Sequence, residues 1–431
     1  MAFTETVSAA DGQHAMQRHR LLLWVLLTGF TYGLVEITAW GGLKLLPLLG
    51  YRPEPPAPEL ALSQRHRERI RGWIDPGGQY FMHSSSLGWT VRANGSAYIF
   101  MANSQGIRAD REYTPDPPPG KIRLAGFGDS FTHGAEVDLE ATWENRIEAM
   151  DPGLEVLNFG VDAYGLDQSY LRYLQDGSRF DPHIVLIGFM SENINRAVNV
   201  FRPFYQPQTG APFVKPRYRL EGDGLALVPS PISGVEAYQT LLDDTETTLR
   251  RLGVNDHYYQ VRYSGDALSR LPSRRLWRAI ANVLSGKDPL APGFRDGRYD
   301  TGSEAYRITE KLIDQFYMAA LDRNALPVIL IYPDRKDMLR HDSGKPQSYK
   351  PLIDHLENSG YGWIDLRETL SAIAPDERFL ERGHYTPAGN NAVARAVLDY
   401  MKTQNLDTVA EIGQRLDSER SRFATGSLPS P

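Results

Sequence analysis

The feature that most constrains the fold of this 431-residue chain is a series of short apolar runs separated by stretches with helical spacing. Runs of this kind are typical of strands buried on both faces, and the helical stretches between them indicate βα units. The sequence therefore predicts an α/β fold with a doubly wound, mostly parallel sheet. Its five strands are expected at residues 122–127, 155–159, 184–189, 327–332 and 361–366.

The last predicted helix has a clear start signal. Thr386 can cap the free N–H groups of a first turn, and Pro387 suits the first helical position, where no N–H is needed. Val393, Val397 and Met401 would then face the sheet. A doubly wound sheet binds its ligand outside the carboxyl ends of its strands, so we expect the functional residues there.

Composition and missing motifs exclude several classes of function. A formal charge of -6 leaves no excess of positive charge to neutralise phosphates, so we expect no nucleic-acid partner. The absence of Cys excludes disulfides, thiolate zinc sites and a Cys nucleophile. P-loop, Gly-x-Gly-x-x-Gly, His-x-x-x-His and EF-hand patterns are also missing, so we expect neither a metal nor a cofactor.

An apolar stretch near the N-terminus predicts a transmembrane anchor at residues 21–43, preceded by an N-terminal tail at 1–20. A cleaved signal peptide and a buried core helix are the alternatives, but the run is long for a signal and no Ala-x-Ala site follows it. Glu36 lies inside the stretch and is expected to mark a helix partner. The basic residues on the two sides do not decide the orientation.

Three further segments complete the predicted organisation. Residues 44–120 would form a proline-rich linker and a small β-rich cap, and 404–431 a C-terminal tail. The domain between them, 121–403, would carry an insertion at about 197–302, with a hairpin at 217–228 and helices over 245–284. The insertion mixes cationic and aromatic residues that suit sugar or anionic polymer contacts, or else line a solvated loop: Arg202, Phe204, Tyr205, Lys215, Arg217 and Tyr218.

Ser130 lies three residues after the first predicted strand, in the run Gly128-Asp129-Ser130-Phe131-Thr132-His133-Gly134. A Gly-Asp-Ser turn can simply cap a helix. The longer run, however, resembles block I of the SGNH (GDSL-type) hydrolases, GDSxTxG. The resemblance implies a flavodoxin-like five-stranded sheet and Ser130 as a nucleophile.

The same resemblance implies an oxyanion hole, in which fixed N–H groups stabilise the negative oxygen of a tetrahedral intermediate. Ser130 N–H and Gly160 N–H, at the end of the second strand, would be two of its donors. The third would be the side-chain amide of Asn193 after the third strand, although the usual Gly-x-Asn-Asp is not present and Asn195 competes for the role.

His384 is the expected base, because the run from Glu381 to Asn390 resembles the family's Asp-x-x-His followed by a Thr-Pro-x-Gly helix start. A serine hydroxyl needs such a base to take its proton. The acid three residues before the histidine is Glu381 rather than Asp. Asp376, or a Ser-His dyad with no acid, stays open.

The anchor and the motif together predict a serine esterase or deacetylase that works through an acyl-serine intermediate. Its expected substrates are acyl esters of cell-envelope glycans, and the acyl group is expected to be acetyl. We expect it on the inner membrane as a single-pass protein with a periplasmic catalytic domain. An O-acyltransferase that moves the acyl group to a polysaccharide hydroxyl is the first alternative. A catalytically silent scaffold of a polysaccharide assembly is the second.

Overall fold

The computed structural model describes residues 4–49, 59–75 and 80–424. It divides into two compact units. One is formed by Met1–Glu59 and Arg262–Lys287, and the other by Leu60–Val261 and Asp288–Pro431. The chain thus passes between the units three times, and a segment of the predicted insertion belongs to the N-terminal unit.

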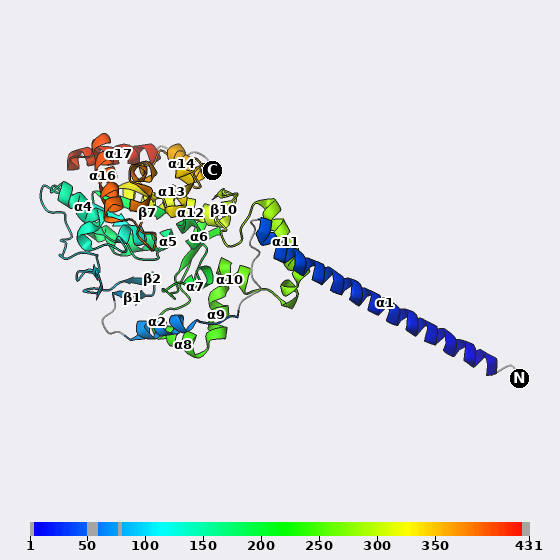
Figure 1. The fold of residues 1–431 in the computed structure, drawn as a ribbon. Coiled ribbons are helices and arrows are strands. Elements are labelled where there is room, and N and C mark those ends of the chain that lie inside the picture. The colour runs from blue at the N-terminus through cyan, green and yellow to red at the C-terminus, as the bar shows by residue number, and fades with distance from the viewer. Residues whose placement is uncertain (1–3, 50–58, 76–79, 425–431) are drawn as a thin grey trace. The chain divides into compact units, whose positions relative to one another are not determined.

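The larger unit is built around a five-stranded sheet (Figure 1). Its strands are β5 (Ile122–Phe127), β6 (Leu154–Asn158), β7 (Ile184–Met190), β12 (Leu326–Tyr332) and β13 (Trp363–Asp365). They are hydrogen-bonded in the order β13-β12-β7-β5-β6, and every pair is parallel. The predicted doubly wound, flavodoxin-like sheet is confirmed, because this order reverses direction between β5 and β7.

Helices cover both faces of the sheet, as the apolar strands require. On one face, Leu124 of β5 shares a core with residues of α4 (Trp143–Met150) and α16 (Pro387–Thr403). On the other, the Phe127 ring packs against Tyr173 of α5 (Leu166–Gln175) and Phe316 of α12 (Glu304–Asp322). Helix α16 begins as predicted, since Thr386 Oγ1 accepts the Gly389 N–H at 3.0 Å and Pro387 is its first residue.

The predicted cap contains two short antiparallel pairs. The first joins β1 (Phe81–Ser84) to β2 (Gly88–Val91), and the second joins β3 (Ser96–Ala97) to β4 (Phe100–Met101). Before them comes α2 (Gln64–Ile74), which the expected linker did not include; Ser63 caps it by accepting the His66 N–H. The prolines at 53–58 lie outside the described residues.

The insertion folds into short helices and a hairpin rather than a solvated loop. Strands β8 (Arg217–Glu221) and β9 (Gly224–Val228) form the predicted hairpin. Of the cationic and aromatic set, all but Tyr205 are buried, and Lys215 and Arg217 pair with Asp167 and Glu304. The short helix α6 (Asn193–Arg196) comes just before the insertion. The helices of the insertion are α7 (Arg202–Tyr205), α8 (Ala237–Asp243), α9 (Thr245–Gly253), α10 (His257–Arg262) and α11 (Pro272–Ser285), and the strands β10 (Phe294–Arg295) and β11 (Arg298–Tyr299) follow them.

The prediction of a C-terminal tail at 404–431 is wrong for most of that range. Residues Val409–Ala424 form α17, and Ile412 and Leu416 on one face of this helix are buried. Their spacing of four residues brings them to the same side of a helix, so they can pack together. The remaining helices of the larger unit are α3 (Ser130–His133), α13 (Arg335–Asp342), α14 (Lys350–Ser359) and α15 (Arg367–Ser371).

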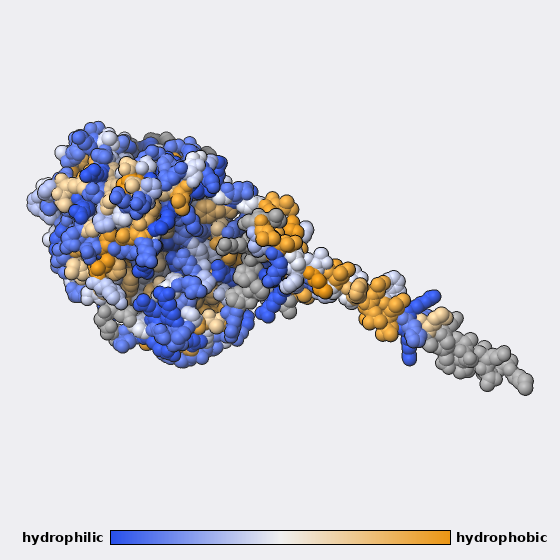
Figure 2. Space-filling view, viewed as in Figure 1, coloured by the Kyte–Doolittle hydropathy of each residue, from blue (hydrophilic) through white to orange (hydrophobic). Residues whose placement is uncertain are grey.

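The N-terminal unit consists of α1 (Thr4–Leu45), the short turn Leu46–Leu49 and α11. The stretch Met16–Leu48 is long and apolar enough to span a membrane, and no residue of its most apolar part is buried; Figure 2 shows the orange surface of α1. Glu36, expected to mark a helix partner, has one in α11. Its two carboxylate oxygens accept the Ser273 N–H at 2.9 Å and the Ser273 hydroxyl at 2.6 Å.

Candidate active site

Ser130 begins α3 in a tight turn after β5. Asp129 caps this helix, because its Oδ1 accepts the Phe131 N–H at 2.9 Å. A Cβ atom on Gly128 would lie 2.0 Å from Thr132 Oγ1, so only glycine fits at this position. The turn buries Ser130 at the carboxyl edge of the sheet and leaves 5% of its surface exposed.

The structure brings His384 next to this turn. The ring of Phe131, the residue after Ser130, lies 5.4 Å from the His384 ring and 4.7 Å from the Tyr385 ring, measured between centroids. The hydrogen bonds found among the described residues include none between Ser130 and His384. His384 Nε2 is likewise without a hydrogen-bond partner in this part of the chain.

The other ring nitrogen of His384 has an unexpected acidic partner. Its Nδ1–H donates to Glu136 Oε2 at 2.6 Å, and its backbone N–H approaches the same oxygen at 3.3 Å. The second oxygen of Glu136 accepts the Arg382 N–H at 3.2 Å. One carboxylate therefore orients both the imidazole and the loop that carries it.

The expectation that Glu381 or Asp376 would hold His384 is wrong. Both side chains are exposed, and neither is hydrogen-bonded to His384 within the described ranges. The physical reason is a tight turn that is closed by the Leu380 N–H donating to His384 O at 2.8 Å. Glu381 lies on this turn and is exposed.

A buried arginine holds the loop on which Glu136 lies. Arg108 donates from Nη1 to the carbonyl oxygens of His133 and Gly134, the latter at 2.6 Å, and from Nη2 to Val137 O at 2.6 Å. These carbonyls flank Glu136, whose φ of 71° is a conformation that few non-glycine residues adopt. The three contacts stabilise that conformation.

His133 is a second histidine near Ser130, but the cap encloses it. The Tyr80 hydroxyl lies 2.8 Å from its Nε2, and the Phe100 ring packs edge-on against it. Burial lowers the pKa of His133 well below its ordinary value, and the positive charge of Arg108 acts in the same direction. His133 is therefore neutral and is part of the packing beneath the nucleophile turn.

Gly160 lies beside the same turn, but its N–H is already engaged. It donates to Asn158 Oδ1 at 2.9 Å, and the Asn158 amide donates in turn to Thr132 O at 2.9 Å. The Gly160 N–H, expected to be an oxyanion donor, is instead part of a hydrogen-bonded link between β6 and α3. The glycine is required for close approach, because a Cβ at this position would lie 2.1 Å from His133 N.

Asn193 and Asn195 follow β7 and are both buried. The side-chain oxygen of each is inaccessible to solvent and has no hydrogen-bond partner among the described residues. The main chain of Asn195 is tied down, because its carbonyl accepts the Tyr258 hydroxyl at 3.0 Å. A buried acceptor that lacks a partner is costly, so it commonly marks a place where a ligand or water donates a hydrogen bond.

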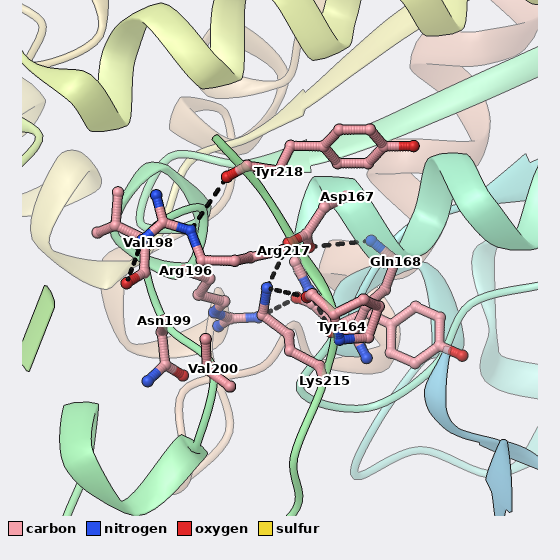
Figure 3. Close-up of polar contacts among 12 residues, drawn as sticks. Tyr164, Asp167, Gln168, Arg196, Val198, Asn199, Val200, Lys215, Arg217 and Tyr218 are labelled. Atoms are coloured by element: carbon pink, nitrogen blue, oxygen red, sulfur yellow. Dashed lines mark hydrogen bonds and ion pairs between the residues drawn. The ribbon is translucent and has the colours of Figure 1, made fainter. Parts of the chain in front are cut away.

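Charged pairs tie the nucleophile turn and the insertion to their neighbours, and Figure 3 shows one of these pairs, Lys215 with Asp167. Arg196 pairs with Asp129 at 3.2 Å and with Glu192 at 2.9 Å, and it donates to Tyr164 O at 2.7 Å. Burial disfavours the charge of Arg196, but the two carboxylates outweigh this effect and raise its pKa. The predicted sugar-contact residue Lys215 is occupied in the same way, by Asp167.

Sequence reasoning missed three residues of this site: Asn158, Glu136 and Arg108. Asn158 stands inside the block that contains Gly160, so a search for local side-chain acceptors could have found it. Glu136 follows Ser130 by only six positions, but it meets His384 through a loop conformation that leaves no signal in the sequence. Among the described residues, no group of three or more His, Cys, Asp or Glu could hold a metal ion.

No protein-family model matches the sequence, and no curated protein matches it either. Solved structures do. A lipolytic protein of the G-D-S-L family from Desulfitobacterium hafniense is 10% identical and matches over 65% of this chain and 99% of its own, with a TM-score of 0.33. A GDSL-like lipase from Bacteroides thetaiotaomicron is 8% identical and matches over 67% of this chain and 91% of its own, with a TM-score of 0.33.

An acetylxylan esterase from Geobacillus stearothermophilus is 12% identical over 65% of this chain and 95% of its own, with a TM-score of 0.34. The parallel sheet order and the Gly-Asp-Ser turn are features of this chain itself. In its Gly-Asp-Ser motif and in the order of its parallel sheet, the chain is similar to the SGNH (GDSL-type) hydrolases.

Proposed function

We propose that the chain is a serine esterase whose reacting groups are Ser130, His384 and Glu136. The observation that supports this best is the 2.6 Å hydrogen bond between His384 Nδ1 and Glu136, next to the Ser130 turn. A carboxylate on Nδ1 fixes the tautomer of the imidazole and leaves Nε2 as the base. The acid of this triad, Glu136, thus comes from the loop after the nucleophile rather than from the position of Glu381, three residues before the histidine.

In the first step, Ser130 Oγ attacks the ester carbonyl while His384 Nε2 takes the hydroxyl proton. The tetrahedral intermediate then collapses, the alcohol leaves with that proton, and the acyl group stays on Ser130 as an ester. Water, deprotonated by His384, releases the acid in the second step. For the oxyanion we propose Ser130 N–H in the first turn of α3 and the Asn193 side-chain amide as donors.

We propose acetyl esters of cell-envelope glycans as the substrate class, with α1 as a single-pass inner-membrane anchor and the catalytic domain in the periplasm. The small exposed fraction of Ser130 and the aromatic packing around Phe131 favour a short acyl group. The apolar surface of α1 supports the anchor. An acetate ester should accordingly be cleaved faster than an octanoate ester of the same alcohol.

A fluorophosphonate probe tests the nucleophile in the full-length protein in detergent. We expect labelling of the wild type and loss of labelling in Ser130→Ala, with Ser191→Ala, directly after the neighbouring strand β7, as a matched control. Absence of labelling in the folded wild type would contradict the enzyme proposal and favour the silent scaffold.

The same residues would serve an O-acyltransferase, in which a sugar hydroxyl replaces water in the second step. Incubation with an acetylated donor and an unacetylated glycan separates the two. Free acetate as the sole product, whatever the acceptor, supports the esterase, whereas acetylated acceptor supports the transferase.

A further inference from the structure

Helix α11 has an apolar face that the described residues leave uncovered. Trp277, Ile280 and Leu284 are spaced by three and four residues, so they lie on one side of the helix. Trp277 and Leu284 are 72% and 82% exposed. Large apolar side chains that are grouped and exposed in this way mark an interaction surface.

The same helix carries positive charge and no acidic residue. Its sequence from Pro272 to Ser285 contains Arg274, Arg275 and Arg278. Arg274 and Arg278 are exposed and one turn apart, on a different side from the apolar face. An amphipathic helix with arginines beside Trp and Leu suits the boundary between acyl chains and anionic headgroups.

The position of α11 on α1 identifies what covers the apolar face. α11 packs on the C-terminal part of α1: Ser273 binds Glu36, and a Cβ on Gly42 would lie 3.0 Å from the Leu276 side chain. The neighbouring residues of α1 include Trp40, which has the Lys44 ammonium 5.5 Å from its ring centre. Trp and Lys are enriched where a membrane helix meets the headgroups.

We infer that α11 is a second membrane contact. Its face of Trp277, Ile280 and Leu284 enters the bilayer in which α1 is anchored, and Arg274 and Arg278 bind the phosphates of anionic lipids. The inference rests on the proposed anchor. It also explains why a segment more than 200 residues away from α1 forms one compact unit with it.

The absence of native Cys allows a direct test with single labelled positions in the full-length protein. Leu284→Cys, Ser285→Cys and Leu26→Cys are each coupled to an environment-sensitive fluorophore and reconstituted in phosphatidylcholine vesicles with phosphatidylglycerol. Lipids brominated on their acyl chains serve as the quencher. We expect strong quenching at 284 and at 26, and several-fold weaker quenching at 285, which lies on the arginine side.

The three positions separate the possible failures. Quenching at 26 but not at 284 would overturn the α11 contact and leave the anchor intact, with a second copy or another part of the chain covering the face. No quenching at 26 would overturn both. Equal quenching at 284 and 285 would also overturn the inference, because the helix would then have no defined face toward lipid.

The proposed binding of anionic lipids by Arg274 and Arg278 is tested by changing the lipid composition. Quenching at 284 should decrease when phosphatidylglycerol is omitted, and the double substitution Arg274→Gln and Arg278→Gln should abolish that dependence. If the substituted protein responds to phosphatidylglycerol as strongly as the unsubstituted one does, the arginines do not bind the headgroups.

Discussion

At the scale of single residues, the hydrogen bond between Glu136 and His384 is the most consequential contact of the molecule. Glu136→Gln keeps the shape of the side chain but replaces the charged acceptor, so the correct imidazole tautomer is no longer favoured. We expect kcat on an acetate ester to decrease by about 10²- to 10⁴-fold, by analogy with other triads.

Glu381→Gln is the matched control, because it removes the carboxylate that the motif suggested. Its kcat should stay close to that of the wild type. A large loss of kcat in this variant, together with an active Glu136→Gln protein, would identify Glu381 rather than Glu136 as the acid.

His133 makes a prediction about stability at acidic pH. Its pKa is lowered by burial below the ordinary 6.5, so the unfolded chain binds a proton that the folded chain does not. Above pH 6.5, the histidine is neutral in both the folded and the unfolded chain. As the pH falls below 6.5, the unfolded chain gains a proton that the folded chain does not, so the free energy of unfolding decreases. The free energy of unfolding in urea should decrease between about pH 7 and pH 5.5 by a smaller amount in His133→Gln than in the wild type. Equal decreases would contradict the prediction.

At the scale of elements, the loop between α3 and α4 carries the proposed acid Glu136, and Arg108 holds this loop. Arg108→Lys keeps the charge but cannot reach three carbonyl oxygens in one plane. We expect kcat to decrease by roughly 10- to 100-fold, because small displacements of a reacting group are costly. The downfield proton resonance of His384 Nδ1–H should broaden as well. A lower kcat with an unchanged resonance would indicate a different cause.

Elements with periodic burial could be predicted from the sequence, whereas those fixed by tertiary contacts could not. The end positions of β5 and of the β8–β9 hairpin agree with the prediction, because apolar runs and the turn at Glu221-Gly222 are local signals. Helix α17 was missed although Ile412 and Leu416 have helical spacing, since the Ser, Gly and Pro residues after it suggested a tail. The candidates Ser130 and His384 come from motifs, whereas the contact of Glu136 with His384 depends on a positive φ in a loop and has no motif.

At the scale of the whole molecule, the proposed membrane contacts, α1 and α11, both lie in one of the two units. A fragment that starts at Leu60 keeps the sheet and the candidate site but leaves α11 without α1. We expect such a fragment to associate in solution, and to become monodisperse when Trp277 and Leu284 are both replaced by Ser. Its kcat on a soluble acetate ester should equal that of the full-length protein. Size-exclusion chromatography and the ester assay check the two expectations, and a monodisperse unsubstituted fragment would contradict the first.

The pairing of Glu36 with Ser273 also has a consequence for biosynthesis. The two residues are separated by 237 positions in the chain. Since ribosomes add about 5–20 residues per second, the α1 helix emerges roughly 10–50 s before the residue that completes it. During that interval the proposed membrane anchor lacks the Ser273 donors that its Glu36 carboxylate has in the folded unit. The speed of translation therefore sets the shortest time for which the Glu36 carboxylate is without this partner.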